Sequence, residues 1–291
     1  MATLANAENG AEESRRCSIC PHCCSLTKDT LGICGTRTLQ NGKVVSLSYG
    51  QSTGLSLDPI EKKPLARFHP GAKILSYGSF GCNMRCPFCQ NASISTLRAD
   101  ASLPTEFISP QDLVGRARTL KAQGNIGIAL TYNEPFIAWE HLLDCARAAR
   151  EADLLVAVVT NGYVNRTAWE TALPLIDAAN IDLKCYTEEG YSKLGTPGGL
   201  GVVKESIRSA HAAGVHVEVT TLVVPDFSDG EDVFREECAW LASIDSAIPL
   251  HITRFFPCHE AAHKRPTSIK VMNRFKHIAK DYLSQVFLGN V

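Results

Sequence analysis

Three features are scarce in this sequence: net charge, long apolar runs and low-complexity segments. Lys and Arg total 29 against 30 Asp and Glu, so the formal net charge is -1. Because bulk nucleic-acid binding depends on many phosphate-neutralising Lys and Arg side chains, this balance argues against it. The longest apolar run is about six residues, 154–159, against roughly 20 for a membrane span. We therefore expect no nucleic-acid partner and no membrane partner.

The sequence also lacks a secretory signal and the composition of a non-globular chain. Residues 1–16 place no basic region before an apolar one. They are polar and rich in Ala, Glu and Asn, which predicts a disordered tail. Hydrophobic residues make up 45% and charged residues 20%, as in globular proteins. Disordered, collagen-like and coiled-coil chains are excluded, and a cytoplasmic location is expected.

Cysteine, in contrast, is plentiful and clustered. Five of the 12 cysteines lie within 17–34 and three within 82–89. In a reducing compartment such clusters more often bind metal or perform redox chemistry than form disulfides. The other four are expected to be small core residues: Cys145, Cys185, Cys238 and Cys258.

Strands and helices alternate from residue 73 onward. The candidate strands are short, rich in β-branched residues and apolar on both faces, as in a buried parallel sheet. They are 74–79, 126–131, 154–160, 180–185, 215–224 and 249–255. Helices are expected over 136–152, 200–213, 229–243 and 266–285, and another should begin after its cap, Ser109. This pattern predicts an α/β fold, a partial (β/α)6 TIM-type barrel over 73–291.

A compact Gly- and Cys-rich segment, 17–72, precedes the predicted barrel. Alternation over 43–49 predicts a strand that ends at Gly50. Turns are expected at Asp58-Pro59 and at His69-Pro70-Gly71. We therefore divide the chain into a tail (1–16), a Cys-rich N-terminal segment (17–72) and a barrel (73–291).

The loop after the first barrel strand carries Cys82-x3-Cys86-x2-Cys89. Three converging thiolates suit a soft metal. Structural zinc sites want four ligands, and no fourth Cys or His is close in sequence. A 4Fe-4S cluster held by three cysteines leaves one iron open to a substrate, although a zinc site completed from elsewhere is the alternative.

This spacing, with the aromatic Phe88 just before Cys89, resembles the signature of the radical S-adenosylmethionine (SAM) superfamily. The resemblance implies a 4Fe-4S cluster on Cys82, Cys86 and Cys89, with SAM on the open iron. It also implies that one electron cleaves SAM and leaves a 5′-deoxyadenosyl radical, which abstracts hydrogen from a substrate. A low-potential ferredoxin or flavodoxin is the expected electron donor.

Further motifs follow the predicted strands, where a barrel site belongs. Asn133 and Glu134, in TYNEP, stand where superfamily members often carry Gly-Gly-Glu and hold the amino group of SAM. Thr160 and Asn161 resemble the Thr-Asn-Gly segment of glycyl-radical-enzyme activases, which lies beside the cofactor. Val159 replaces the Asp that often precedes that Thr.

The fourth and sixth predicted strands add charged candidates. Asp182 and Lys184 match the Asp-Leu-Lys of the same activases, whose charged residues face the cofactor. Arg254 could bind a carboxylate bidentately, and we expect the substrate to enter near it. His251 is the one histidine with a fair chance of facing the site.

The N-terminal cysteines form a second candidate metal centre. The spacing Cys17-x2-Cys20-x3-Cys24-x9-Cys34 could close a zinc site or hold an auxiliary 4Fe-4S cluster. Absence of metal is the third alternative, and the sequence leaves all three open.

The order of CSICPHCC, GICGTR, DPIEKKPL, the cluster loop, YNEP and IDLK resembles one subgroup, the radical enzymes of the AmmeMemoRadiSam system. These are similar to pyruvate formate-lyase activating enzymes. The resemblance implies Memo-like and AMMECR-type partner proteins.

Three functions remain open: hydrogen abstraction from an unidentified substrate, glycyl-radical activation, and a non-catalytic metal-binding scaffold. An activase would leave the open side of the sheet uncovered, whereas segment 17–72 covering that opening would favour a different substrate.

Overall fold

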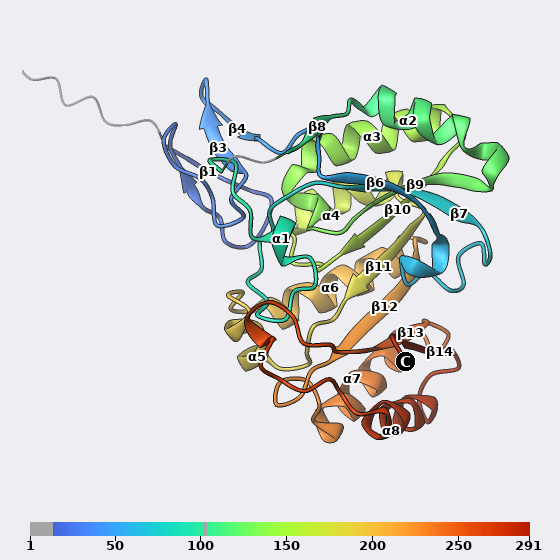
Figure 1. Ribbon diagram of the computed structural model, residues 1–291. Coiled ribbons are helices and arrows are strands. Elements are labelled where there is room, and N and C mark those ends of the chain that lie inside the picture. The colour runs from blue at the N-terminus through green and yellow to red at the C-terminus, as the bar shows by residue number, and fades with distance from the viewer. Residues whose placement is uncertain (1–13, 102–103) are drawn as a thin grey trace, which may run out of the picture.

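The structure is a computed structural model that describes residues 14–101 and 104–291. It is an α/β fold around one large sheet (Figure 1). The tail predicted for residues 1–16 lies almost entirely outside the described residues. Within the described ranges, no helix combines the length and low polarity that crossing a membrane would require.

The central sheet has eight strands in the order β14-β13-β12-β11-β10-β9-β7-β6. Its strands are parallel except for β6, which runs antiparallel to β7. They are β6 (Gly54–Pro59), β7 (Lys73–Gly78), β9 (Asn125–Thr131), β10 (Leu155–Thr160), β11 (Ala178–Asp182), β12 (His216–Val223), β13 (Leu250–Arg254) and β14 (Val286–Gly289). The sheet is therefore an open, partial barrel, which confirms the predicted fold class. Strands β6 and β14 extend the six predicted strands at both edges.

Helices follow the parallel strands in turn. They are α2 (Pro110–Thr119), α3 (Trp139–Glu151), α4 (Arg166–Ala172), α5 (Glu188–Lys193), α6 (Gly199–Ala212), α7 (Glu231–Ile244) and α8 (Ile269–Lys280). Ser109 caps α2 as predicted, because its side chain accepts from the Asp112 backbone N–H. Helices α4 and α5 were not predicted from the sequence, since each is short, at 7 and 6 residues. The helix predicted over 266–285 is α8, which is shorter at both ends and stops at Lys280.

The Cys-rich segment forms a small lobe beside the cluster loop and α1 (Ala92–Ser95), as Figure 1 shows in blue. The lobe consists of the pairs β1 (Arg15–Arg16) with β2 (Ser25–Leu26) and β3 (Arg37–Gln40) with β4 (Lys43–Ser46). A further pair joins β5 (Gln51–Ser52) to β8 (Glu106–Phe107). The predicted strand 43–49 is thus β4, which is shorter than expected. His22 Nε2 lies 2.8 Å from the Asn83 carbonyl, so the lobe contacts the cluster loop directly.

Residues 60–68, which we call the floor segment, close the barrel below the sheet's carboxyl ends. Ile60 and Leu65 are fully buried, and they pack with Phe68 against small residues of three strands. Those residues are Ala129, Ala157 and Ala178. The small side chains leave space inside the barrel that the floor segment fills.

The floor segment also corrects one expectation. Asp58-Pro59 is no turn; the two residues end strand β6, where Asp58 pairs with Ile74 of β7. Pro59 is tolerated there because β6 is an edge strand, where a missing N–H breaks no ladder. The predicted turn at His69-Pro70-Gly71 is confirmed and leads the chain into β7.

Candidate active site

A cavity of about 830 Å³ lies at the carboxyl ends of the strands. The cluster loop, β9 to β14 and the floor segment all contribute to its walls. The sequence-predicted residues that line it are Cys82, Cys86, Phe88, Cys89, Asn133, Glu134, Thr160, Asn161, Asp182, Lys184 and His251. Residues from five separate stretches of sequence are thereby brought together around one space.

The three cluster-loop thiols differ in their surroundings. Cys82 Sγ is 3.4 Å from the Met84 N–H and 3.6 Å from Asn161 Nδ2. Both groups donate to the sulfur and favour its thiolate form. Burial nevertheless raises the pKa of Cys82 above its usual value and that of Cys86 to about 12. A cationic metal centre would offset that burial, because thiolates, not thiols, are metal ligands.

The backbone of the cluster loop is held by two asparagines. Asn133 Nδ2 donates to the Phe80 and Gly81 carbonyls at 3.1 Å each, and its Oδ1 accepts from the Ser79 N–H at 3.1 Å. Its side-chain carbonyl is thus engaged by the loop. Asn83, which the sequence analysis missed, is buried and donates to the Tyr163 carbonyl at 2.8 Å.

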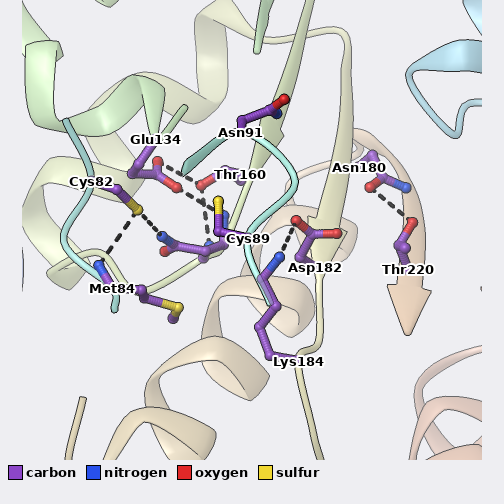
Figure 2. Close-up of polar contacts among 12 residues, drawn as sticks. Cys82, Met84, Cys89, Asn91, Glu134, Thr160, Asn180, Asp182, Lys184 and Thr220 are labelled. Carbon is purple, nitrogen blue, oxygen red and sulfur yellow. Dashed lines mark hydrogen bonds and ion pairs between the residues drawn. The ribbon is translucent and has the colours of Figure 1, made fainter. Parts of the chain in front are cut away.

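Glu134 is a buried carboxylate with three donors, and Figure 2 shows it beside one of them, Thr160. Thr160 Oγ1 and the Phe136 N–H donate to Oε1 at 2.8 and 3.0 Å, and the Asn161 N–H donates to Oε2 at 2.8 Å. Burial raises the pKa of Glu134 to about 7 although these donors lower it. An ammonium group entering the cavity would supply the positive charge that this buried site lacks.

Asn161 connects this carboxylate to the cluster loop. Its Nδ2 donates to Asn83 Oδ1 at 2.8 Å as well as to Cys82, and its Oδ1 accepts from the Tyr163 N–H at 2.9 Å. The third strand end, the cluster loop and the Glu134 site therefore share one hydrogen-bond network. A change at Asn161 should disturb all three.

Tyr132 joins the second strand end to the floor of the cavity. It has φ of 72°, a conformation that non-glycine residues rarely adopt. Its hydroxyl donates to Asp58 Oδ2 at 2.7 Å, and Lys63 Nζ lies 2.8 Å from the same oxygen and 4.3 Å from the Tyr132 ring centre. Gly78 is required beside it, since a Cβ there would lie 2.6 Å from the ring. This network gives the DPIEKKPL motif a structural role that its sequence did not reveal.

Asp182 and Lys184 form an ion pair of 2.7 Å at the fourth strand end. Burial disfavours the lysine cation, but Asp182 and the nearby Cys86 together raise the pKa of Lys184 above its usual value. The charged lysine therefore lies on the cluster-loop side of the cavity, where it favours ionisation of Cys86 (Figure 2).

Arg254 does not lie where the sequence analysis expected it. Arg254 is not among the described residues that line the cavity. Side chains alternate along β13, and His251 and Thr253 are the ones that face inward. Arg254 Nε donates to the Thr267 carbonyl at 2.7 Å, and its guanidinium lies 4.7 Å from the Phe256 ring centre. The guanidinium thus contacts the neighbouring loop, and the structure does not bring Arg254 together with the other predicted site residues.

The N-terminal cysteines lie near one another in the small lobe. Cys17, Cys20 and Cys34 are buried, while Cys24 is half-buried and its sulfur accepts from the Ile33 N–H at 3.4 Å. Burial raises the pKa of Cys20 to about 12, and the charges of Cys34 and Cys17 add to the effect. All 12 cysteines are free.

In the described part of the chain, no three His, Cys, Asp or Glu side chains already stand grouped as ligands of a metal ion. Neither cysteine set is therefore already arranged as a metal centre in the described residues. The cluster loop fits a 4Fe-4S cluster in its donor chemistry: three soft thiols opening on one cavity, with N–H donors at Cys82 and a cation near Cys86.

Comparison with known proteins places the chain in a family. A family model described as the Radical SAM superfamily matches residues 77–236. The chain is 34% identical over 284 residues to an uncharacterised protein of Methanocaldococcus jannaschii, covering 95% of this chain and 81% of that protein. It is 25% identical to pyruvate formate-lyase 1-activating enzyme of Escherichia coli, covering 56% of this chain and 65% of that enzyme. This chain belongs to the radical SAM superfamily.

Solved structures agree on the fold. Streptococcus suis SuiB bound to S-adenosylmethionine superposes with a TM-score of 0.53 at 12% identity, covering 72% of this chain and 47% of that one. A radical SAM methyltransferase from Sphaerobacter thermophilus superposes with a TM-score of 0.54 at 16% identity, covering 76% of this chain and 67% of that one. As a superfamily member related to glycyl-radical activases, the chain is an enzyme of radical chemistry whose cofactors are a 4Fe-4S cluster and SAM.

Proposed function

We propose that this enzyme cleaves SAM reductively and uses the 5′-deoxyadenosyl radical to take hydrogen from a substrate held in the cavity. The observation that carries the proposal is the convergence of the three-cysteine loop and three strand-end motifs on one cavity of about 830 Å³. A non-catalytic scaffold would need the cysteines but not the motifs.

In this proposal, one set of residues holds the cluster and another holds SAM. Cys82, Cys86 and Cys89 hold the cluster, and Asn133 keeps their loop in place through its backbone contacts. When bound, the cluster and SAM supply an electron and a radical that can break an unactivated C–H bond. Glu134 accepts the ammonium of SAM, and Thr160 and Asn161 fix that carboxylate.

The fourth strand and the loop aromatic complete the cofactor site in this proposal. Asp182 faces the cofactor as the ion-paired partner of Lys184, and the lysine cation balances negative charge at the cluster. Phe88 lines the cavity and packs 5.1 Å from the Phe227 ring, so it stiffens the loop between Cys86 and Cys89.

Activases of this superfamily typically take their electron from a reduced donor, and we propose a ferredoxin or flavodoxin here. We assign the chain to the AmmeMemoRadiSam system, with Memo-like and AMMECR-type partners, on the motif order of its sequence. The free cysteines fit the reducing cytoplasm. The N-terminal lobe is proposed to hold zinc or a second 4Fe-4S cluster on Cys17, Cys20, Cys24 and Cys34.

Glycyl-radical activation is the second candidate function. Similarity to the Escherichia coli activating enzyme favours it. The floor segment, however, closes the cavity below, and the wall of the cavity includes Phe287, Leu288, Gly289 and Asn290. A cavity walled on these two sides suits a small molecule or a single side chain better than an entering protein loop.

The test is anaerobic. The protein is reconstituted with iron and sulfide, reduced with dithionite, given SAM, and assayed for 5′-deoxyadenosine. We expect the unaltered protein to form it and the triple variant C82A/C86A/C89A to lose both the product and about four irons per chain. The matched control C145A/C238A, two buried core cysteines far from the loop in sequence, should keep the product.

Two results would contradict the proposal. One is a reconstituted protein that holds zinc, no cluster and no cleavage activity, which would favour the scaffold. The other is undiminished product from the triple variant. Iron that remains in the triple variant would support the cluster form of the N-terminal centre.

A further inference from the structure

A histidine that lines the cavity, His251, contacts a fully buried carboxylate, Glu218, which is not itself among the described lining residues. Glu218 of β12 and His251 of β13 both point into the barrel, on the same sides of their strands as Thr220 and Thr253. In the register of the two strands Thr220 pairs with His251. His251 therefore lies level with Thr220, and Glu218 lies one inward-facing position below them, against the floor segment.

Glu218 is fully buried and satisfied by four donors. The Ala66 and Arg67 N–H groups of the floor segment donate to it at 2.9 and 2.7 Å. His216 Nε2 and His251 Nε2 lie 2.9 and 2.6 Å from its two oxygens. Burial alone would favour the neutral acid, but these partners lower the pKa of Glu218 to about 2. Since an ionised carboxylate can only accept, each Nε2 carries the proton.

The His251 ring is fixed in place, but only one of its two nitrogens has a hydrogen-bond partner among the described residues. Glu218 holds Nε2, and the Phe287 ring stacks on the imidazole at 5.1 Å with planes 20° apart. The other ring nitrogen, Nδ1, has no hydrogen-bond partner among the described residues. It is also not one of the fully buried polar atoms that lack a partner, which means that it is not sealed inside the protein. The residue lines the cavity, so this nitrogen reaches cavity space.

We propose that His251 is the proton-transfer residue of this active site and that Glu218 is its positioning residue. The inference rests on the proposed function and adds a substrate class to it. The substrate carries an ionisable O–H or N–H group beside the reacting carbon. In the transfer, that O–H or N–H bond breaks and an N–H bond forms at His251 Nδ1, with no electron gained or lost.

Charge balance supports this assignment. The imidazolium that forms lies against an ionised Glu218, as in enzymes where a buried carboxylate orients and stabilises a catalytic histidine. The other charged or titratable neighbours are His216, beyond Glu218, and Arg67, whose guanidinium lies 5.4 Å from the Phe287 ring centre. His216 lines a separate cavity of about 530 Å³ and offers a matched control.

The test uses the reconstituted, full-length protein and diethyl pyrocarbonate, which acylates a reachable, unprotonated imidazole nitrogen. Labelling of each histidine is followed by peptide mass spectrometry as a function of pH. We expect His251 to be labelled together with the exposed His263, and the buried His141 to stay unlabelled. A purely structural His251, with both nitrogens out of reach, would behave like His141 and overturn the proposal.

Variants test the role of Glu218. In E218Q the imidazolium loses its stabilising charge, so the pH profile of His251 labelling should move to lower pH. In H216Q, which removes a different partner of the same carboxylate, the profile should stay in place. Equal profiles in E218Q and the unaltered protein would overturn the positioning role.

The E218Q protein could fail to fold, and H251Q then supplies a second comparison, since it should remove only the label assigned to His251. The same preparations are assayed for 5′-deoxyadenosine. Its absence in the unaltered protein would contradict the proposed function. An unreactive His251 in a preparation that forms 5′-deoxyadenosine would contradict this proposal alone.

Discussion

At the level of single residues, buried carboxylates in this enzyme differ in how fully they are satisfied. Glu134 and Glu218 have three and four donors, whereas Glu237 of α7 accepts from one group in the described part of the chain, the Thr221 hydroxyl. Burial raises the pKa of Glu237 to about 8. Glu237 should therefore be protonated in the folded protein at neutral pH.

This predicts a pH dependence of stability. The folded-state pKa of Glu237 lies above its unfolded value of 4.5, so the folded protein binds more protons between these values. The free energy of unfolding should then fall as pH rises through that window, by up to about 1.4 kcal/mol per pH unit from this group. Urea unfolding at several pH values measures the slope.

The variant E237Q should flatten that slope, since it replaces the acid with a neutral side chain of similar shape. Its control is E236Q, the exposed neighbour on the same helix, which should keep the original slope. Equal slopes in both variants would show that Glu237 is ionised in the folded protein.

Single residues also show how far placement around the cavity could be predicted from the sequence. The cluster cysteines, Glu134 and Asn161 were predicted because each follows a strand, and parallel strands end at one edge. The expected position of Arg254 differs from the observed one because a motif does not reveal whether the last side chain of a strand points into or out of the barrel. Asn83 and Glu218 were missed, since a polar residue inside a loop or strand gives no signal of its partners.

At the level of elements, the floor segment depends on one ion pair. Lys63 has a side chain only 3% exposed, and its partner Asp58 is 8% exposed. Burial opposes ionisation of Asp58, but hydrogen bonds from Lys63 and Tyr132 hold its pKa well below the usual range. Removing one partner leaves a buried charge without compensation.

We predict that D58N lowers the free energy of unfolding by about 3 kcal/mol, in the range for a broken buried pair. The double variant D58N/K63M should recover much of this loss, because neither charge remains. The control K62M removes a side chain that is 68% exposed, and it should change stability little. The stabilities are measured by urea unfolding. If the losses of D58N and K63M simply added up in the double variant, Asp58 and Lys63 would not be coupled.

Strand β9 is constrained where it meets β10. A Cβ on Gly127 would lie 1.9 Å from the Leu155 carbonyl oxygen, so the two strands could not keep their register. We predict that G127A costs more than about 2 kcal/mol of stability. The control G115A, at an exposed helical position with nothing within 4 Å, should instead add about 0.5–1 kcal/mol. Thermal unfolding of both proteins measures these changes in stability. A G127A protein as stable as the unaltered one would contradict the close approach of Gly127 to Leu155.

At the scale of the whole molecule, the barrel and the floor segment converge on one cavity, and the N-terminal lobe contacts the cluster loop beside it. The six central strands and the cap at Ser109 were predictable, because apolar β-branched runs and capping residues are local signals. Strands β6 and β14 were not, since each is an edge strand whose pairing depends on a neighbour distant in sequence. The DPIEKKPL motif was recognised as specific, but its role appears only when residues 58–67 meet β11 and β12 across the barrel.

The central claim is that the strand-end residues hold SAM at a cluster bound by the loop cysteines. It is tested most directly by electron paramagnetic resonance of the reduced, reconstituted protein before and after SAM is added. We predict that SAM changes the spectrum of the unaltered protein, and that E134Q, which loses a carboxylate charge, needs more SAM for the same change. A spectrum that SAM leaves unaltered would contradict the account.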